Sequence, residues 1–284
     1  MRTIIYIATF ILFISCKKDN LASETFKYPK VIDTLGVANL YDSPNSIQTP
    51  INYVYRVDKF TSVIDLRDTL KPYKYLIDAH FLSDTTNKII TKRNGLKIVV
   101  DTTSEITIRN TDAIFDLYKN YPWGESRSKK QEYIDSISYN AVEIYLSKNP
   151  KLFKGLSVYI TNPTSKSIRV KEQDWRIMMI QEALDKSGKW KPIEYWKYSE
   201  CGNSYGDIAL KPNHFIMTKV VKYSGNFKTK IRLKFLNDSL VYYSKPFEGS
   251  INLGQFDTTA IQYKLEKRHF LSPDEKRKKL KIIK

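Results

Sequence analysis

The residues from Phe227 to Phe235 alternate strictly between two kinds of side chain. Apolar or hydroxyl side chains stand at every second position, and a basic side chain stands at each position between them: Lys228, Lys230, Arg232 and Lys234. A β-strand turns successive side chains to opposite faces, so this segment can bury one face and expose the other. Antiparallel sheets commonly pack one face and leave the other in water. The pattern therefore predicts a half-buried strand of an antiparallel sheet.

Short runs with strand character, separated by turn residues, occur along most of the chain. Val, Ile, Thr, Tyr and Phe favour strands, whereas Gly, Pro, Asn and Asp favour the turns between them. The expected strands cover residues 51–57, 87–91, 96–101, 105–109, 156–161, 175–184, 190–198, 215–221, 227–235 and 240–243. One short helix is expected between Thr111 and Pro122, and a second within residues 128–147, a segment that also fits a strand.

These patterns predict a mainly β protein. Residues 31–150 form a β-rich N-terminal domain with one or two short helices, residues 151–270 form an antiparallel β-sandwich, and residues 271–284 form a basic tail. Short strands with turns about every 8 to 12 residues are typical of such a sandwich. The order and spacing of the strands from Leu156 to Phe256 resemble the immunoglobulin-like modules of exported bacterial proteins. This resemblance implies an immunoglobulin-like sandwich in the C-terminal half.

The first residues have the layout of a secretory signal. Arg2 is followed by the almost wholly apolar stretch Ile4–Ile14, and Ser15 and Cys16 come next. The stretch is far shorter than the roughly 20 apolar residues of a membrane-spanning helix. The cysteine at the cut, in Phe13-Ile14-Ser15-Cys16, resembles the lipobox of bacterial lipoproteins, and Ser-Cys-Lys-Lys-Asp resembles the junction common in Bacteroidota lipoproteins.

The lipoprotein resemblance implies that residues 1–15 are a signal peptide and that Cys16 carries the lipid. Residues 16–30, which are polar and mixed in charge, then form a tether. The protein is expected in the cell envelope as a membrane-anchored lipoprotein, at the outer membrane and facing the periplasm or the cell surface. Several buried acyl chains, each contributing about 0.8 kcal/mol per methylene, hold a protein stably at a bilayer. An ordinary cleaved signal that ends by chance at a cysteine is the alternative.

The net charge indicates the class of partner, and the cysteine content indicates how the fold is stabilised. The net charge is +17, and export takes the protein away from most nucleic acid, so we expect an anionic glycan, anionic lipid or envelope proteins as partners. A basic surface that only aids solubility is the alternative. With Cys16 acylated, Cys201 has no partner within the chain, so the exported protein depends on its core rather than on disulfides.

Two groups of side chains are candidates for glycan or anion binding. Trp190, Trp196 and Tyr198 fall on one face of the strand expected at residues 190–198, where aromatic rings can stack on sugars or fill the core. The basic positions of the first motif, Lys228, Lys230, Arg232 and Lys234, would stand about 7 Å apart along their strand. That row is either a docking stripe for acidic glycan or lipid headgroups or a solvated outer face.

The sequence gives weak support for catalysis. Gly202-Asn203-Ser204-Tyr205-Gly206 has the spelling of a nucleophile elbow, which needs a strand before Ser204 and a helix after it, and Pro212 would break that helix. A glycine-rich turn is the favoured interpretation. Cys201 with His214 as base is a further candidate, against a small residue buried at a strand end. No metal-ligand spacing is present, so no metal, cofactor or catalytic residue is predicted.

Aspartate followed by a hydroxyl residue and then an apolar residue or Thr recurs seven times. These triplets resemble the acceptor motif of the Bacteroidota O-glycosylation system. The resemblance implies sugar attachment at Thr34, Thr69, Thr85, Thr102, Ser136, Ser239 and Thr258. The alternative is structural, since Asp favours the start of a turn and Thr the start of a strand.

Together these features predict a lipid-anchored lipoprotein of the cell envelope that serves as a non-enzymatic recognition or assembly module. A glycan-binding surface lipoprotein with an aromatic platform is one alternative. An envelope hydrolase that uses Ser204 or Cys201 is another.

Overall fold

A computed structural model describes residues 27–32, 39–50, 54–59, 61–65, 95–109, 126, 128–129, 152–259, 261 and 264–272. Several predictions fall outside these residues: Cys16 and the signal peptide, the strand at 87–91, the helix that begins at Thr111, most of residues 128–147, and the basic tail from Pro273. No helix among the described residues is long and apolar enough to cross a membrane.

Two antiparallel sheets form the body of the fold. The first has the order β3-β13-β7-β5, and a further strand, β6, also pairs with β7. Its strands are β3 (Val54–Lys59), β5 (Lys97–Val100), β6 (Ile106–Arg109), β7 (Leu152–Thr161) and β13 (His214–Val221). The second has the order β11-β10-β15-β16, and β17 also pairs with β15. Its strands are β10 (Met179–Leu184), β11 (Trp190–Pro192), β15 (Phe227–Asn237), β16 (Leu240–Tyr243) and β17 (Phe247–Ile251).

Smaller elements complete the structure. A three-stranded sheet, ordered β12-β8-β9, is formed by β8 (Ile168–Gln173), β9 (Arg176–Ile177) and β12 (Tyr205–Leu210). Two parallel pairs join β1 (Lys30–Ile32) to β4 (Val63–Asp65) and β2 (Tyr41–Asp42) to β14 (Tyr223–Ser224). Short 3-10 helices are η2 (Gly202–Ser204), η3 (Leu253–Phe256) and η4 (Lys267–Phe270).

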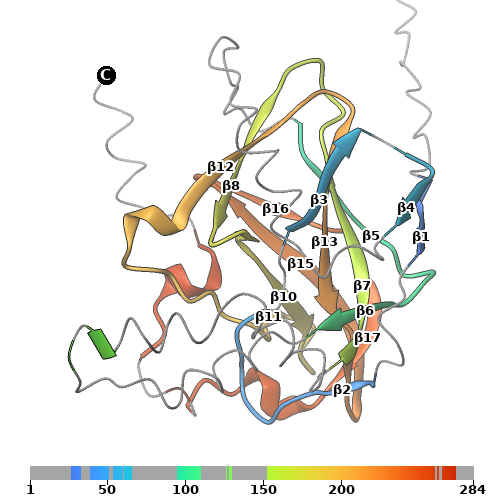
Figure 1. The fold of residues 1–284 in the computed structure, drawn as a ribbon. Coiled ribbons are helices and arrows are strands. Elements are labelled where there is room, and N and C mark those ends of the chain that lie inside the picture. Colours follow the sequence, from blue (N-terminus) through green and yellow to red (C-terminus); the bar gives the residue numbers. More distant parts are fainter. Residues whose placement is uncertain are drawn as a thin grey trace, which may run out of the picture.

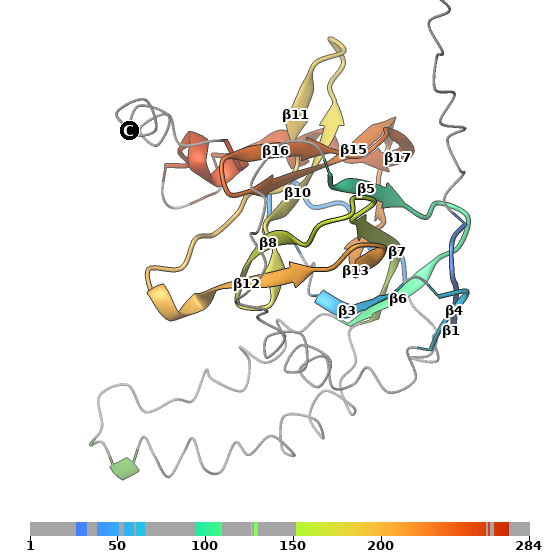
Figure 2. The same ribbon diagram turned by 90° about the horizontal axis from the view of Figure 1, so that it is seen from above.

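The two main sheets pack face to face. Figure 2 shows β15, β16 and β17 in the upper layer, with β3, β7 and β13 below them. The largest core cluster draws buried side chains from both layers, among them Val158 and Ile216 from the lower and Leu233 and Phe235 from the upper. Full burial of such a side chain contributes about 1.5–3 kcal/mol. The mainly β fold with antiparallel sheets in the C-terminal half is therefore confirmed, and the immunoglobulin-like topology stays a prediction.

The predicted strand at 227–235 is confirmed. Ile231, Leu233 and Phe235 are at most 2% exposed, while Lys228 and Lys230 lie in water. The predicted strands at 215–221 and 240–243 also agree with β13 and β16.

The predicted boundary at residue 150 does not separate the described strands into two sheets. Strand β3 pairs with β13, and β5 and β6 pair with β7, so segments on both sides of residue 150 share the first sheet. The strand predicted at 190–198 is wrong in length, because β11 ends at Pro192. Proline has no N–H to continue the ladder, and the backbone beyond it pairs with Gln48 instead.

Residues 39–50, named the strap here, run along the lower edge of the sandwich in Figure 1. Asn39 exchanges backbone hydrogen bonds with β7, because its N–H donates to Leu152 and its carbonyl accepts from Lys154. Further along, Ile47 is buried and donates its N–H to the carbonyl of Asp257 at 2.9 Å. The strap therefore ties the first sheet to the segment that follows β17.

Candidate recognition surface

The outward side of the second sheet carries the basic residues predicted from the alternation. In the register of this sheet, Arg232 on β15 stands opposite Glu182 on β10, and Lys234 stands opposite Tyr243 on β16. Trp190 on β11 pairs with Leu184, two positions along β10 from Glu182. These strands turn the following side chains to one surface, named the outer face here: Glu182, Trp190, Lys228, Lys230, Arg232, Lys234 and Tyr243.

Arg232 is the centre of the outer face. Its guanidinium carbon lies 4.3 Å from the ring centroid of Trp190 and 4.0 Å from that of Tyr243. Its Nε and Nη2 donate to one carboxylate oxygen of Glu182, at 2.9 and 2.7 Å. A planar cation between two rings gains about 0.5–1 kcal/mol from each contact at a partly exposed site. Arg232 is thus fixed by neighbours on three sides.

The row keeps an excess of positive charge. Glu182 also faces Lys234, whose Nζ lies 3.5 Å from its second oxygen. Within the described part of the chain, Lys228 and Lys230 form no ion pair, although Glu248 is the register partner of Lys230. One carboxylate therefore balances two cations, and two exposed lysines extend the field along β15.

Tyr243 gives the outer face an exposed phenol. It is 47% exposed, and its pKa is raised by partial burial and by the charge of Glu182, against the opposite effect of Arg232. At neutral pH its hydroxyl is protonated and can donate a hydrogen bond. The sequence pattern did not single out Tyr243. The turn residues Asp238 and Ser239 between β15 and β16 place it opposite Lys234, and they are the signal that could have found it.

The aromatic platform, one of the two interpretations of Trp190, Trp196 and Tyr198, is not formed. Trp196 is fully buried, and its indole N–H donates to Gln173 at 2.8 Å. It covers the far end of the same sheet, where it packs in a small cluster with Ile180 and Leu271. Tyr198 is half-buried beside this cluster. Only Trp190 of the three lies on the outer face, because the strand that was to align them ends at Pro192.

The candidates for nucleophilic chemistry lack the required geometry. Ser204 ends η2 and leads into β12 rather than a helix, so the nucleophile elbow is wrong and the turn interpretation is right. Its hydroxyl lies 2.8 Å from that of Ser199. Cys201 is exposed, not buried as expected for a structural residue. The ring of His214 donates to the carbonyl of Pro212 at 2.8 Å.

No metal centre is formed by the part of the chain that the structure describes, since no three His, Cys, Asp or Glu side chains gather there. His269 is buried in η4, where its Nδ1 accepts a hydrogen bond from the N–H of Glu266 at 2.9 Å. That contact closes a capping box, which is a structural role.

Three of the predicted glycosylation positions are described. Thr102 and Thr258 are exposed, and each follows an aspartate that caps a turn. Asp101 accepts hydrogen bonds from the N–H and the hydroxyl of Thr103 at 2.9 and 2.6 Å. Asp257 accepts from the same two groups of Thr259. Ser239 is half-buried in the turn after β15. Glycosylation stays a prediction, and the other candidates lie outside the described residues: Thr34, Thr69, Thr85 and Ser136.

Sequence reasoning missed a buried acid. Glu194 is 2% exposed and accepts hydrogen bonds from the Tyr223 hydroxyl at 2.6 Å and from the side chain and N–H of Gln181 at 3.0 and 2.7 Å. Tyr223 in turn accepts from Gln48 of the strap, which accepts from Tyr41. Burial raises the pKa of Glu194 to about 7. Nothing in the local sequence distinguishes this Glu, because its burial comes from the strap.

Comparison with known proteins adds no family to these observations. No protein-family model, no curated protein and no solved structure matches the chain.

Proposed function

We propose that this protein is a lipid-anchored, non-enzymatic recognition module of the cell envelope that binds an acidic glycan on its outer face. The observation that carries this proposal is Arg232, held between Trp190 and Tyr243 and flanked along β15 by lysines. Guanidinium groups bind carboxylates with two parallel hydrogen bonds, while aromatic rings accept the C–H faces of sugars.

The shape of the surface favours a polymer over a small molecule. A strand is straight, and its same-face side chains repeat about every 7 Å. Lys228, Lys230, Arg232 and Lys234 therefore offer a line of cations that can follow a chain of acidic sugars. A lipid bilayer would need the whole face to lie flat on headgroups, whereas the Trp190 and Tyr243 rings suit individual sugar rings. The secretory signal and the lipobox-like Cys16 support a place in the envelope, outside the reach of nucleic acid.

Charge reversal tests the proposed glycan surface. The Lys228→Glu/Lys230→Glu variant of the full-length chain is expected to bind polygalacturonate at least about tenfold more weakly, because two attractive contacts become repulsive. Both side chains are exposed, so the fold should tolerate the change. The measurement is titration calorimetry at low and high salt, and wild-type binding should weaken as salt rises.

The matched control is Lys166→Glu/Lys197→Glu, which changes the net charge equally at exposed positions away from the outer face. Equal losses in both double variants would show a diffuse charge effect and remove the proposed site. No binding of polygalacturonate by the wild-type protein would overturn the choice of an acidic glycan.

Lipidation is tested at Cys16. Cells that express the wild-type protein are expected to incorporate radiolabelled palmitate into it. The Cys16→Ala variant should lose the label and leave the membrane fraction, because the acyl chains that hold the protein at the bilayer are no longer attached. A variant that stays in sedimented membranes as the wild type does would contradict the anchor.

A further inference from the structure

A hollow of about 530 Å³ lies where four segments meet, next to the start of β15. It is lined by Asn45, Lys186, Asn226, Phe227, Asn252, Leu253 and Gly254. These residues come from the strap, from the turn between β10 and β11, from the entry to β15, and from the segment that follows β17. Its volume is within the roughly 300–1,000 Å³ of sites that hold small molecules.

Buried and part-buried hydrogen bonds fix the strap against the segment after β17, which also lines the hollow. The hydroxyl of Ser43 accepts from the N–H of Asn252 at 2.8 Å and donates to Gln255. The side-chain amide of Asn252 donates to the carbonyl of Ser43 at 2.5 Å. Gly254 allows a close approach, because an added Cβ would lie 2.9 Å from the carbonyl oxygen of Asn45. The positions of Asn45 and Asn252 are thus set before any ligand arrives.

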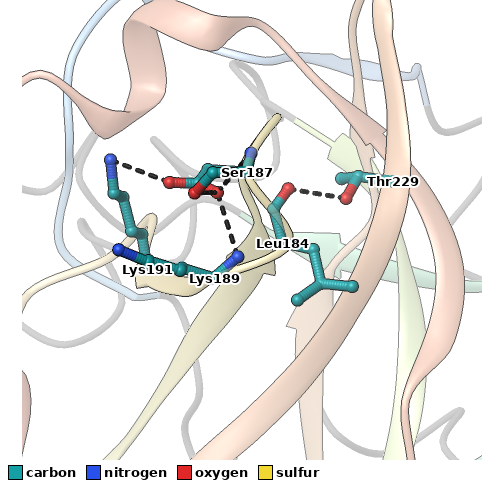
Figure 3. Close-up of polar contacts among 6 residues, drawn as sticks. Leu184, Ser187, Lys189, Lys191 and Thr229 are labelled. Carbon is teal, nitrogen blue, oxygen red and sulfur yellow. Dashed lines mark hydrogen bonds and ion pairs between the residues drawn. The ribbon is translucent and has the colours of Figure 1, made fainter.

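The turn that carries Lys186 is equally well held. Asp185 accepts from the hydroxyl of Ser187 at 2.7 Å and from the N–H of Lys189 at 3.0 Å, and it pairs with Lys191 at 2.9 Å. Figure 3 shows these contacts, together with the hydroxyl of Thr229 on the carbonyl of Leu184, which ties the turn to β15. The hydrogen bonds from Ser187 and Lys189 hold the pKa of Asp185 well below its ordinary value.

Two exposed asparagine side chains at the hollow, those of Asn45 and Asn226, keep unused hydrogen-bonding capacity. The amides of Asn45 and Asn226 form no hydrogen bond within the described part of the chain, although the backbone N–H of Asn226 donates to Asn252 at 3.3 Å. No carboxylate lines the hollow, so it offers no cation ligand set. Phe227 and Leu253 add apolar edges, and Leu253 is 40% exposed.

We propose that this hollow binds a neutral sugar unit through the amides of Asn45 and Asn226. A side-chain amide donates and accepts at once, which matches hydroxyl groups that do the same. Phe227 offers a ring edge to the C–H groups of the sugar, and Lys186 at the rim can donate to a ring or glycosidic oxygen. Preformed loops lower the ordering cost of binding. The site uses none of the outer-face side chains, although Lys228 directly follows Phe227, and it stands whether or not that face binds an acidic glycan.

Saturation-transfer NMR on the full-length chain tests the inference with the methyl glycosides of glucose, galactose, mannose and N-acetylglucosamine. At least one of them, at about 10 mM, is expected to show transfer, as suits the weak affinity of a single sugar. The Asn45→Ala/Asn226→Ala variant should bind it roughly tenfold more weakly, because two hydrogen bonds are lost. Neither amide forms a hydrogen bond with another described residue, so circular dichroism should be unchanged.

Two controls separate this site from the outer face. Binding of a neutral sugar should be insensitive to salt and unchanged in Lys228→Glu/Lys230→Glu, whereas binding of polygalacturonate should be sensitive to both. A Lys186→Ala variant should weaken sugar binding by a smaller factor than the double asparagine variant. Absence of transfer to all four glycosides, or full transfer in the Asn45→Ala/Asn226→Ala variant, would overturn the inference.

Discussion

Between pH 4.5 and pH 7, the free energy of unfolding of the wild-type protein is expected to fall by about 3 kcal/mol relative to that of a Glu194→Gln variant. Burial disfavours the charged carboxylate and raises the pKa of Glu194 to about 7, although hydrogen bonds from Tyr223 and Gln181 partly oppose this. In the unfolded chain the same group titrates near its ordinary value of 4.5.

The direction of the effect follows from proton binding. Well below pH 4.5 both states hold the proton of Glu194, so this group adds no pH dependence. As the pH rises toward 7, the unfolded chain releases the proton and the folded protein keeps it, which favours unfolding. Above the folded pKa both states are ionised and the loss is complete.

Urea unfolding of both proteins at a series of pH values checks this result. The difference between the two curves is the useful quantity, because the lowered pKa values of Glu105 and Asp257 contribute equally to both proteins. At low pH the variant should be the less stable one by about 1–2 kcal/mol, since a Gln amide carries two donor hydrogens and the protonated carboxyl only one, where Gln181 and Tyr223 both donate. Parallel curves would show that Glu194 does not titrate in this range.

A Tyr223→Phe variant gives an independent control. The hydroxyl of Tyr223 donates to Glu194 and lowers its pKa, so removing the hydroxyl should raise that pKa further. The loss of stability should then end at a higher pH than in the wild type. An unchanged end point would indicate that this hydrogen bond has little effect on the carboxylate.

Local patterns predicted the parts of the fold whose cause is local. The alternation at 227–235 is a property of consecutive residues, and the structure confirms both the strand and its basic outward side. The turn at Asp185–Gly188 has a local cause too, since Gly188 adopts a positive φ of 75° and Asp185 bonds the turn backbone. In both cases the residues that determine the conformation are neighbours in sequence.

Contacts between distant segments could not be predicted from local sequence patterns. Strand β8 ends in Glu172 and Gln173, polar residues that are typical of an exposed loop. Both are buried, and Gln173 accepts a hydrogen bond from the indole of Trp196, which is distant in sequence. The alternative of a sugar platform from Trp190, Trp196 and Tyr198 is wrong, and the burial of Trp196 agrees with the interpretation that these rings fill the core. The strap pairs Asn39 with Phe153, a register between remote segments that no periodicity encodes. The sequence predicted only part of the outer face. The basic side chains of β15 follow from a local pattern, whereas strand pairing places Glu182 and Tyr243 beside them.

Gly225→Ala is expected to lower the free energy of unfolding by about 3 kcal/mol. Gly225 lies between β14 and β15, where the end of β17 crosses it closely. An added Cβ would overlap the backbone of Ile251 and Asn252, and the carbonyl oxygen of Ile251 would lie only 2.5 Å away. Backbone atoms cannot rotate aside as a flexible side chain can, so a paired strand must shift. Urea unfolding at constant pH measures the loss.

Two other glycines serve as matched controls. At Gly202 a Cβ meets nothing within 4 Å, so Gly202→Ala should change the free energy of unfolding by less than about 0.5 kcal/mol. Gly188 also has open space but a φ of 75°, so Gly188→Ala should cost about 1–2 kcal/mol through backbone strain alone. If Gly225→Ala lowers the free energy of unfolding no more than Gly188→Ala does, the end of β17 can move to accommodate the added methyl group. The close contact between Gly225 and the end of β17, next to the proposed sugar-binding hollow, would then be flexible.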